Sequence, residues 1–473
     1  MIGPTVADMA LLMPELILVG VALILILAAR RIRTGQVAST STIFAAGAAA
    51  LAAAGAASSG PTTGFGDMLV VDGYSQFFKL LIAATLVLVA LLSAGRRDGQ
   101  GVPRGEYFVL MLLAATGMML AASATDLIPL YLCLELMTIC SYALVGIRTE
   151  RPPSNEAAIK YFLLGSFASA LLLFGISLIY GLTGTTAYAG IAAALTGTAS
   201  SDQPFVLVAV GLVAAGLAFK IAVVPFHTWA PDAYEGASAP VAGFLAAGSK
   251  AVGLAAAGRV FFVAFGAEAP VISIILVALA ALSMVVGSIM VLPQTDMKRL
   301  LAYSSIAHAG YALLGLLAGT PEGVSATMTY AFFYVFMTLG AFGMLIALGA
   351  RGETLDAFKG LAAQRPGAAA LMLLFLLSLT GIPPTAGFAA KFAVIASAVA
   401  AGQITLAVVA VVCSVITAFV YMRVVVFMYM QESDLPVPAH FPAAVSAALA
   451  LAALVTLVGG IFPGTVIAWA VSP

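Results

Sequence analysis

Three lysines lie deep within long apolar stretches of this sequence. Lys220 follows an apolar run that begins near Phe205, and Lys250 and Lys391 lie inside later runs. A charge at the centre of a bilayer costs about 2.5–3.5 kcal/mol on insertion scales, so such a residue normally faces a bundle interior or a hydrated cavity. The alternative for Lys220 and Lys250 is that they extend to the membrane surface as structural anchors. Because of their depth, we favour a path for ions.

Proline must interrupt the helix that carries Lys220. Pro225 comes five residues later, in the stretch FKIAVVPFHTWAPDAYEGASAPVAGFLAAGSK. Proline cannot donate the helical hydrogen bond and clashes with the preceding turn. In a membrane the freed carbonyls need protein or water partners, so we expect a broken helix beside a polar cavity. Trp229 and Tyr234, further along, are expected at the membrane–water interface.

One carboxylate lies as deep as the lysines. Glu135 lies nine residues beyond Asp126, which at 1.5 Å per residue is about 14 Å into the membrane. A lone buried carboxyl group would stay protonated, whereas a nearby lysine favours its ionised form. We therefore predict that Glu135 pairs with Lys220. The alternative is a neutral Glu135 that is hydrogen-bonded to a carbonyl.

The composition is that of a polytopic membrane protein. Of the 473 residues, 63% are hydrophobic and 8% are charged, which leaves too little polar surface for a soluble fold. The net charge of zero argues against nucleic acid as a partner. The three cysteines lack CxxC spacing, there are only three histidines, and no GxGxxG motif stands between a strand and a helix, so we predict no metal, haem or dinucleotide site. Any redox chemistry must then take place in another subunit.

An all-α fold of about fourteen transmembrane helices follows from about 20 apolar residues per span. The first run ends in AARRIRTG without a small-residue cleavage site, so we interpret it as a retained helix. The expected starts are near Met9, Ser41, Tyr74, Tyr107, Leu127, Ala157, Phe205, Pro240, Val271, Leu300, Ser325, Ala368, Ile404 and Ala443.

Basic and acidic loops alternate along these helices. By the positive-inside rule the basic loops are cytoplasmic and both termini lie outside. Loops after odd-numbered helices hold or abut most of the 20 Lys and Arg residues, namely Arg30, Arg31, Arg33, Arg96, Arg97, Arg104, Arg148, Arg151, Lys160, Lys298, Arg299, Arg351, Lys359, Arg365 and Arg423. Loops after even-numbered helices hold no Lys or Arg and carry Asp67, Asp72, Asp126, Asp202, Glu268 and Glu322. The remaining basic residues lie within spans and form the functional shortlist: Lys79, Lys220, Lys250, Arg259 and Lys391.

The chain also contains an internal repeat. The sequence TDLIPLYLCLELMTICSYALVG from Thr125 resembles TDMKRLLAYSSIAHAGYALLG from Thr295. The offset is five helices, an odd number that reverses direction, so we predict inverted repeats of helices 4–8 and 9–13. Helix 12, with SLTGIPPTAGFAAKF ahead of Lys391, is then the proline-broken counterpart of helix 7. The predicted parts are 1–106 (helices 1–3), 107–266 (first repeat), 267–431 (second repeat) and 432–473 (helix 14).

The second repeat departs from the first at Glu135. Its equivalent is Ser304 or Ser305, depending on which end of the repeat is aligned, so Lys391 is expected to lack a carboxylate partner. His308 lies four residues after Ser304 and on the same helical face. We predict that these three residues of helix 10 line a hydrated path and that His308 hands protons to Lys391. The alternative is a packing histidine that is bonded to a neighbouring carbonyl.

From the first helix to about Lys391, and weakly beyond, the chain resembles the subunit N family of the proton-pumping NADH:quinone oxidoreductase, respiratory complex I. FKIAVVPFHTWAPDAYEGASAPVAGFLAAGSK is the strongest part of the likeness. The related L and M subunits and the Mrp-type antiporter subunits share the broken helix and the PD after the tryptophan. The GSK that ends at Lys250 and the GIPPTAGFAAKF that ends at Lys391 are most similar to subunit N, whose bacterial form has fourteen helices.

The resemblance implies roles for the deep residues. Glu135, in YLCLELMT, matches the fifth-helix glutamate that pairs with the seventh-helix lysine, here Lys220. Lys250 matches the eighth-helix lysine that connects the two halves, and Lys391 matches the lysine of the second half-channel. His227 lies where the family has a histidine at the helix break. We interpret it as a gate or relay, with a structural histidine as the alternative.

The resemblance further implies a subunit of a translocase-class enzyme in the bacterial inner membrane, which moves protons as electrons pass from NADH to quinone. Partner subunits would use NADH, FMN, iron–sulfur clusters and quinone, and an M-type antiporter-like subunit and a small K-type subunit would be neighbours. The alternative is an Mrp-type antiporter that exchanges sodium or potassium for protons. A row of lysines with one glutamate repels cations and suits protons. An inert scaffold would carry apolar residues at these positions.

Overall fold

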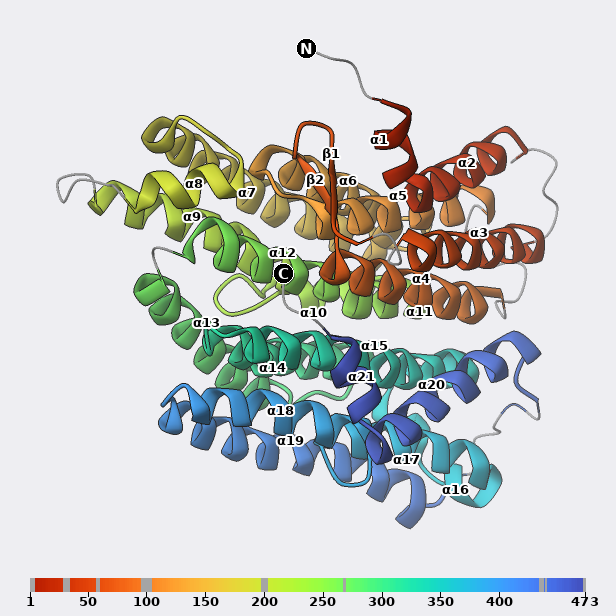
Figure 1. The fold of residues 1–473 in the computed structure, drawn as a ribbon. Coiled ribbons are helices and arrows are strands. Elements are labelled where there is room, and N and C mark those ends of the chain that lie inside the picture. The colour runs from red at the N-terminus through yellow and green to blue at the C-terminus, as the bar shows by residue number, and fades with distance from the viewer. Residues whose placement is uncertain are drawn as a thin grey trace.

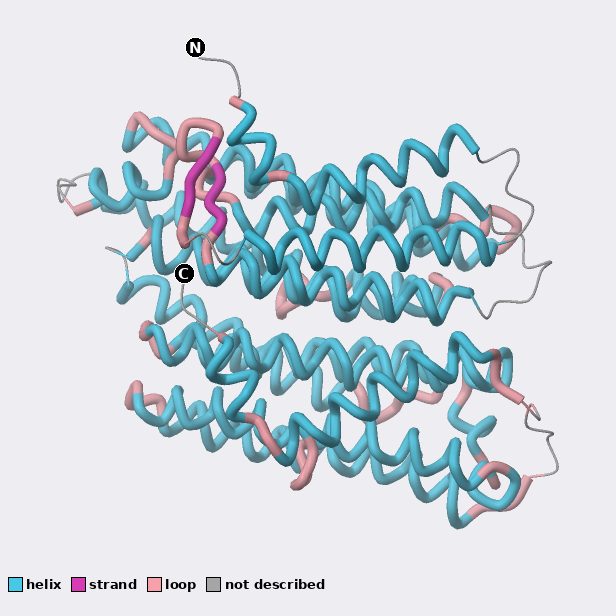
Figure 2. Tube along the Cα trace, turned by 45° about the vertical axis from the view of Figure 1, so that its right-hand side comes forward, coloured by secondary structure: helices cyan, strands magenta, loops and turns pink. Residues whose placement is uncertain are grey.

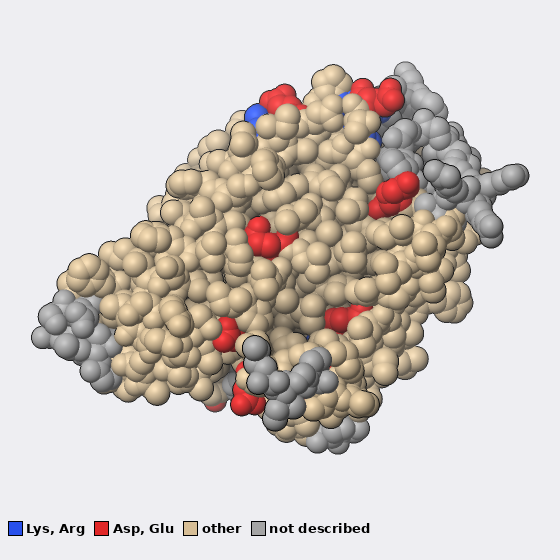
Figure 3. Space-filling model, turned by 90° about the horizontal axis from the view of Figure 1, so that it is seen from above, with Lys and Arg blue, Asp and Glu red and all other residues tan. Residues whose placement is uncertain are grey.

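Long apolar helices make up most of the computed structural model, which describes residues 5–28, 35–56, 60–94, 104–196, 203–266, 269–433, 438 and 440–470. Within these ranges, twelve helices are long and apolar enough to cross a membrane. Figure 3 shows one face of the molecule, most of which carries neither acidic nor basic side chains. The predicted helical membrane architecture is therefore confirmed, apart from one short β-hairpin that the all-α prediction did not include, whereas the count of fourteen spans stays a prediction.

The first half of the chain contains α1 (Val6–Leu11), α2 (Met13–Ala28), α3 (Gly35–Ala56), the strands β1 (Thr62–Gly64) and β2 (Leu69–Val71), α4 (Gly73–Ala94), α5 (Arg104–Ser123), α6 (Leu127–Val145), α7 (Pro152–Thr183), α8 (Tyr188–Leu195), α9 (Gln203–Ile221), α10 (Trp229–Gly236), α11 (Ala239–Phe244) and α12 (Lys250–Arg259). The second half contains α13 (Ala269–Met290), α14 (Met297–Leu317), α15 (Pro321–Leu348), α16 (Leu361–Gln364), α17 (Pro366–Thr380), α18 (Ala386–Ala400), α19 (Ile404–Met430), α20 (Ala443–Ile461) and α21 (Gly464–Trp469).

The helices form two adjoining bundles. In Figure 1, α1 to α12 occupy the upper part of the molecule and α13 to α21 the lower part, and Figure 2 shows the same division from another side. Contacts across the boundary join α11 and α12 to α15, and α10 to α14. The two antiparallel strands form a small hairpin at one end of the first bundle.

The two TD segments of the sequence repeat start their helices in the same way. Asp126 caps α6 by accepting from the Ile128 amide, and Asp296 caps α14 by accepting from the Arg299 amide. The backbone of each aspartate also forms an isolated antiparallel β-bridge with the segment that follows the next long helix. Asp126 pairs with Ala187, and Asp296 pairs with Thr354. The same local contact therefore occurs once in each bundle.

Both predicted helix breaks are present. The helix α9 ends at Ile221, and the chain turns through Pro225 before α10 begins. In the second half, α17 ends at Thr380, and α18 begins at Ala386. Gly381 caps α17 in the left-handed region, with φ of 88°. A Cβ added to Gly381 would lie 2.8 Å from Cδ of Lys391, so glycine serves both the turn and the close approach of that side chain.

Residues from the predicted basic loops gather at one end of the molecule. Arg148 donates to the Gly236 carbonyl, Lys160 pairs with Asp232, and Arg299 pairs with Asp232 and Glu235. The predicted alternation of loops therefore brings the ends of helices 5, 7 and 9 together around α10. Which end faces the cytoplasm stays a prediction. The following residues of the argument lie outside the described ranges: Arg30, Arg31, Arg33, Arg96, Arg97, Asp202 and Glu268.

The opposite end holds the acidic loops. Thr125 donates to the Asp67 carbonyl, which ties the loop after helix 2 to the loop after helix 4. Asp72 pairs with Arg259 near the end of α12 through two hydrogen bonds of 2.9 Å. This pairing explains why Arg259 lies within a predicted span, because its guanidinium reaches the acidic loop.

The expectation that Trp229 and Tyr234 mark the membrane interface is wrong. Both rings are buried in the protein. The Trp229 ring stacks on Tyr161, with centroids 4.2 Å apart, and its Nε1 donates to the Phe219 carbonyl. The reason is that α10 packs against α7 after the helix break. These aromatic side chains are therefore buried inside the protein beside the break and do not face lipid.

Candidate functional site

The predicted ion pair between Glu135 and Lys220 is present. Lys220 Nζ lies 3.0 Å from Glu135 Oε1 and donates to Thr138 Oγ1 at 2.7 Å. Ser169 of α7 donates to the same carboxylate oxygen. The lysine side chain is 2% exposed and the glutamate 19%, so the carboxylate is the more open partner. Three helices therefore hold one carboxylate and one ammonium group in contact near the helix break.

Lys250 binds the carbonyls of both bundles. It begins α12, directly after the π-helical segment Leu245–Ser249, a distortion that is frequent at functional sites. Its Nζ donates to the Ile221 carbonyl at 3.0 Å and to the Ser305 carbonyl at 2.9 Å. The first carbonyl is at the broken end of α9 and the second is in α14. Lys250 is thus held by neutral dipoles at the boundary of the two bundles.

Lys391 occupies a similar place in the second bundle. Its Nζ donates to the Thr380 carbonyl at the broken end of α17 and to Ser414 Oγ of α19. It also lies over the Tyr311 ring, 4.5 Å from the centroid. Among the described residues, no carboxylate lies within ion-pair distance of Lys391.

The two helix breaks are stabilised by the same kind of hydrogen bond. At each break, a lysine amine donates to a carbonyl that has lost its helical partner: Lys250 of α12 to Ile221, and Lys391 of α18 to Thr380. The Val224 amide is satisfied as well, by Ser283 Oγ from the second bundle. Because the freed backbone groups are bonded to side chains of the protein, the breaks can exist at membrane depth.

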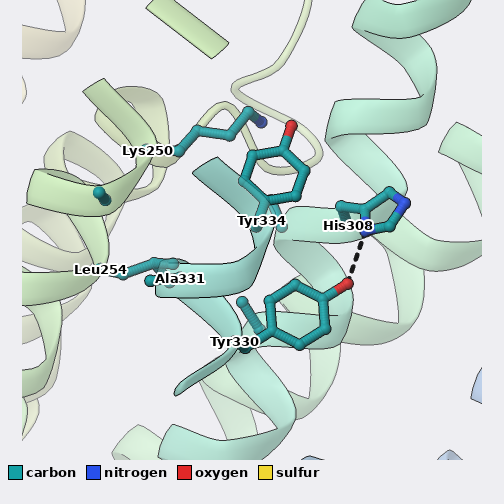
Figure 4. Close-up of a pocket in the computed structure, with 9 residues that line it drawn as sticks. Lys250, Leu254, His308, Tyr330, Ala331 and Tyr334 are labelled. Atoms are coloured by element: carbon teal, nitrogen blue, oxygen red, sulfur yellow. Dashed lines mark hydrogen bonds between the residues drawn. The ribbon is translucent and has the colours of Figure 1, made fainter. Parts of the chain in front are cut away.

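His308 has Lys250 and Lys391 as neighbours on two sides. It lines a cavity with Lys250, and Tyr311 lies between it and Lys391. Its Nδ1 is 2.7 Å from the Tyr330 hydroxyl. Its ring centroid is 5.9 Å from that of Tyr311, over which Lys391 lies. A small cavity between α12, α14 and α15 is lined by Lys250, His308, Tyr330 and Tyr334, together with apolar side chains (Figure 4). The described cavity therefore opens from His308 towards Lys250, and Tyr311 separates His308 from Lys391.

The other predicted residues of this region differ in their surroundings. Ser304 is hydrogen-bonded to the Tyr421 hydroxyl, and Ser305 Oγ donates to the Ala302 carbonyl. His227 lies half-buried in the turn after the helix break, and its Nδ1 has no hydrogen-bond partner within the described part of the chain. The proton-carrying roles of these residues remain predictions.

Sequence reasoning missed the carboxylate that accompanies Lys79. Glu15 of α2 lies 2.9 Å from Lys79 Nζ of α4, and both side chains are almost fully buried. The signal was available, because an acid inside the first apolar run is as unusual as a lysine inside the third. It also missed Thr138, Ser169 and Ser414, hydroxyl groups for which sequence offers no signal. Lys79 thus has a partner of its own, away from the contacts that join Lys220 to Lys391.

Among the described residues, no group of three or more His, Cys, Asp or Glu side chains is placed to hold a metal ion. What the site offers is a row of titratable side chains. It runs from Glu135 and Lys220 through Lys250 and His308 to Lys391, across both bundles. Such a row can pass charge from one group to the next.

Comparisons with known protein sequences agree with this arrangement. A family model described as NADH:quinone oxidoreductase/Mrp antiporter, TM, matches residues 124–417. The chain is 46% identical to NADH-quinone oxidoreductase subunit N of Desulfovibrio desulfuricans, over 98% of this chain and 97% of the relative. It is 40% identical to NADH-quinone oxidoreductase subunit N of Rhodobacter capsulatus, over 97% of this chain and 96% of the relative.

Solved structures give the same result. The chain is similar to one in respiratory complex I from Thermus thermophilus with bound aureothin, with a TM-score of 0.83 and 35% identity over 96% of this chain and 99% of that chain. It is also similar to a chain of the Mrp complex from Dietzia sp., with a TM-score of 0.85 over 98% of this chain and 96% of that chain. The identity there is 24%, so the second likeness shows the fold alone.

Proposed function

The chain belongs to the subunit N family of NADH-quinone oxidoreductases, and on this premise we propose how it moves protons. It is an antiporter-like, proton-translocating membrane subunit of respiratory complex I, and it works with other membrane subunits of that complex. Electron transfer from NADH to quinone in partner subunits drives the transport. The question for this chain is which side chains carry the protons.

Our proposal is a charge relay along the row of buried groups. Loss of a proton from Lys220 would remove its attraction to an ionised Glu135 and the repulsion that it exerts on a charged Lys250. A change of charge at one site thus alters proton affinity at the next. Lys250 would pass the change to His308, and His308 to Lys391, while His227 would act as a gate or relay at the first helix break.

The observation that carries the proposal is the bonding of Lys250. Its ammonium donates to a carbonyl beside Lys220 and to one in α14, the helix that bears His308. No other described residue of the row donates to both bundles. A proton gained or lost at Lys250 therefore changes hydrogen bonds on both sides of the boundary at once.

The experiment is Lys250→Arg in the intact complex. Arginine keeps a charge that practically never dissociates, so a proton carrier at this position would fail whereas a structural anchor would still work. Quinone-linked proton uptake by vesicles is measured beside a blue-native gel that reports assembly. We expect low uptake with normal assembly. Normal uptake would remove Lys250 from the relay.

Further parts of the proposal concern the surroundings of the chain. We propose that it binds no redox cofactor, and that NADH, FMN, iron–sulfur clusters and quinone are used by partner subunits. Its neighbours would be an M-type antiporter-like subunit and a small K-type subunit. It would lie in the bacterial inner membrane with both termini on the periplasmic side, as the distribution of basic loops favours.

The internal division of the chain is also proposed. Residues 107–266 and 267–431 would be inverted repeats, flanked by residues 1–106 and 432–473. The support is local: both TD segments make the same capping and bridging contacts, and both breaks give a carbonyl to a lysine.

A further inference from the structure

Three buried hydroxyl groups of α10 and α15 have no hydrogen-bond partner among the residues that the structure describes. They belong to Tyr334 and Thr338 of α15 and to Tyr234 of α10, and all three side chains are at least nine-tenths buried. Leaving a buried polar group without a partner costs about 1–3 kcal/mol, so native structures rarely tolerate it. Three such groups in one region indicate that another polar molecule binds there and completes their hydrogen bonds.

These hydroxyl groups form a connected cluster. Tyr334 lines the cavity beside Lys250, Thr338 lies one turn further along the same face of α15, and the Tyr234 ring contacts Phe342 of that face. Groups that are close but not bonded to one another are the arrangement that a bridging water molecule satisfies. Ser305 completes the cluster from α14, and its carbonyl already accepts from Lys250.

The cluster reaches the cavity between Lys250 and His308. In Figure 4 the Tyr334 hydroxyl points to the end of the cavity at which the Lys250 amine lies, while the Tyr330 hydroxyl is bonded to His308 at the other end. Tyr330, Tyr334 and Thr338 are spaced by four residues, so they lie along one face of α15. The face therefore carries hydroxyl groups from the cavity towards the end of α15.

At its far end the same face meets α10 and the charged surface. Phe342, four residues beyond Thr338, contacts the Tyr234 ring edge-on, with centroids 6.3 Å apart. Next to Tyr234 in the chain is Glu235, which pairs with Arg299 and is 45% exposed. The hydroxyl cluster thus begins beside solvent-exposed charges and ends beside Lys250.

We propose that Tyr234, Ser305, Tyr334 and Thr338 line a hydrated branch that carries protons between the charged surface at α10 and Lys250. This branch reaches the boundary of the two bundles without passing Glu135 and Lys220. It rests on the proposed function, because it supplies protons to Lys250 as a carrier. Water molecules are its occupants, and the hydroxyl groups hold them in a line that protons can follow.

The test uses Thr338→Val together with Tyr334→Phe in the intact complex. These changes remove two hydroxyl groups and little volume, so assembly on a blue-native gel should be normal. Quinone-linked proton uptake should fall by about tenfold, equivalent to about 1.4 kcal/mol on the transfer barrier. Thr338→Ser keeps the hydroxyl group and should retain normal proton uptake. If the methyl group of Thr338 mattered only for packing, Thr338→Ser would lower the uptake instead.

Thr329→Val is the matched control. Thr329 also has a buried hydroxyl on α15 without a partner among the described residues, but it lies nine residues from Thr338 and hence on the opposite face of the helix. Its loss should leave uptake unchanged. Normal uptake in the double variant would overturn the branch while the Lys250→Arg result stands by itself, and equal loss in Thr329→Val would overturn it too, because position on the helix would then not matter.

Discussion

The buried lysines of this protein are held by different kinds of partner. Lys220 has the carboxylate of Glu135, whereas the hydrogen bonds of Lys250 and Lys391 to described residues go to carbonyl and hydroxyl oxygens. A carboxylate carries a full opposite charge, whereas a carbonyl offers only a dipole. The charged form of Lys220 is therefore favoured by its ion pair, and the proton affinity of Lys250 and Lys391 depends more on charges nearby. Single substitutions should separate these roles.

Glu135→Gln should lower proton pumping more than it lowers assembly. Removing one partner of a buried ion pair costs about 3–5 kcal/mol unless the remaining group changes its protonation, and Lys220 is free to do so. Quinone-linked proton uptake in vesicles and a blue-native gel of the complex measure the two effects. Glu156→Gln is the control, because Glu156 forms an exposed pair with Lys160. Full pumping in an assembled Glu135→Gln complex would contradict the role of the pair.

The pair of Glu15 and Lys79 should behave as a structural pair. Lys79→Met leaves Glu15 buried without its cation, so we expect less assembled complex and a lower unfolding temperature. Adding Glu15→Gln removes the stranded charge and should recover much of the loss. Proton uptake per assembled complex should stay normal in both variants. A drop in uptake per complex would instead place this pair on the proton path.

Broken helices are the elements that bring backbone carbonyls to the lysines. Each break ends a helix at a carbonyl that accepts a hydrogen bond from a lysine of a later helix. A continuous helix would keep that carbonyl in its own hydrogen-bond ladder. The breaks are therefore part of the site, and the residues that form them should affect transport as well as stability.

Gly381→Ala tests the second break. Alanine at φ of 88° is strained, at a cost of about 1–3 kcal/mol, and its Cβ would press on the Lys391 side chain. Gly402→Ala is a matched control, because Gly402 also has positive φ, 78°, but open space around its Cβ. Both variants should lower the unfolding temperature, and only Gly381→Ala should lower proton uptake per assembled complex. Equal uptake in the two would show that the contact with Lys391 is unimportant.

The two bundles are joined at one end by ion pairs. Asp232 of α10 contacts Lys160 of α7 and Arg299 of α14, so it links the first bundle to the second. Partial burial would raise the pKa of the Asp232 carboxyl, but its hydrogen bonds to Arg299 and Lys160 outweigh this and hold the pKa below its usual value. The charged form is therefore favoured in the folded protein.

The stability of this junction should depend on acid. Because the pKa of Asp232 is lower in the folded chain, its contribution is fully present above about pH 4, where an unfolded aspartate is ionised, and is lost as the pH falls through the folded value. Asp232→Asn should remove this part of the acid dependence. Unfolding temperatures of the complex at pH 7 and below pH 4 measure it. An identical pH dependence in wild type and variant would contradict the assignment.

Much of the fold and part of the site could be predicted from the sequence. Lipid allows charges and helix breaks only where they have partners, so Glu135, Lys220, Lys250 and Lys391 stand out in any apolar run, and Pro225 and Pro384 mark the breaks. The depth of Glu135 and Lys220 in their apolar runs favoured an ion pair over a neutral Glu135, and the structure shows the contact at 3.0 Å. These inferences succeeded because the requirement for partners comes from the bilayer itself and does not depend on how the side chains pack.

The tertiary structure decided which groups face one another. Helices far apart in the chain meet with rotations that side-chain packing sets, so the carbonyls that hold Lys250 and the cluster around Tyr334 have no signal in sequence spacing. The same limit explains the error for Trp229, whose type suits a membrane interface but whose helix folds back against α7. Composition and depth determine that a polar group is buried in a membrane protein, and only packing determines its partner.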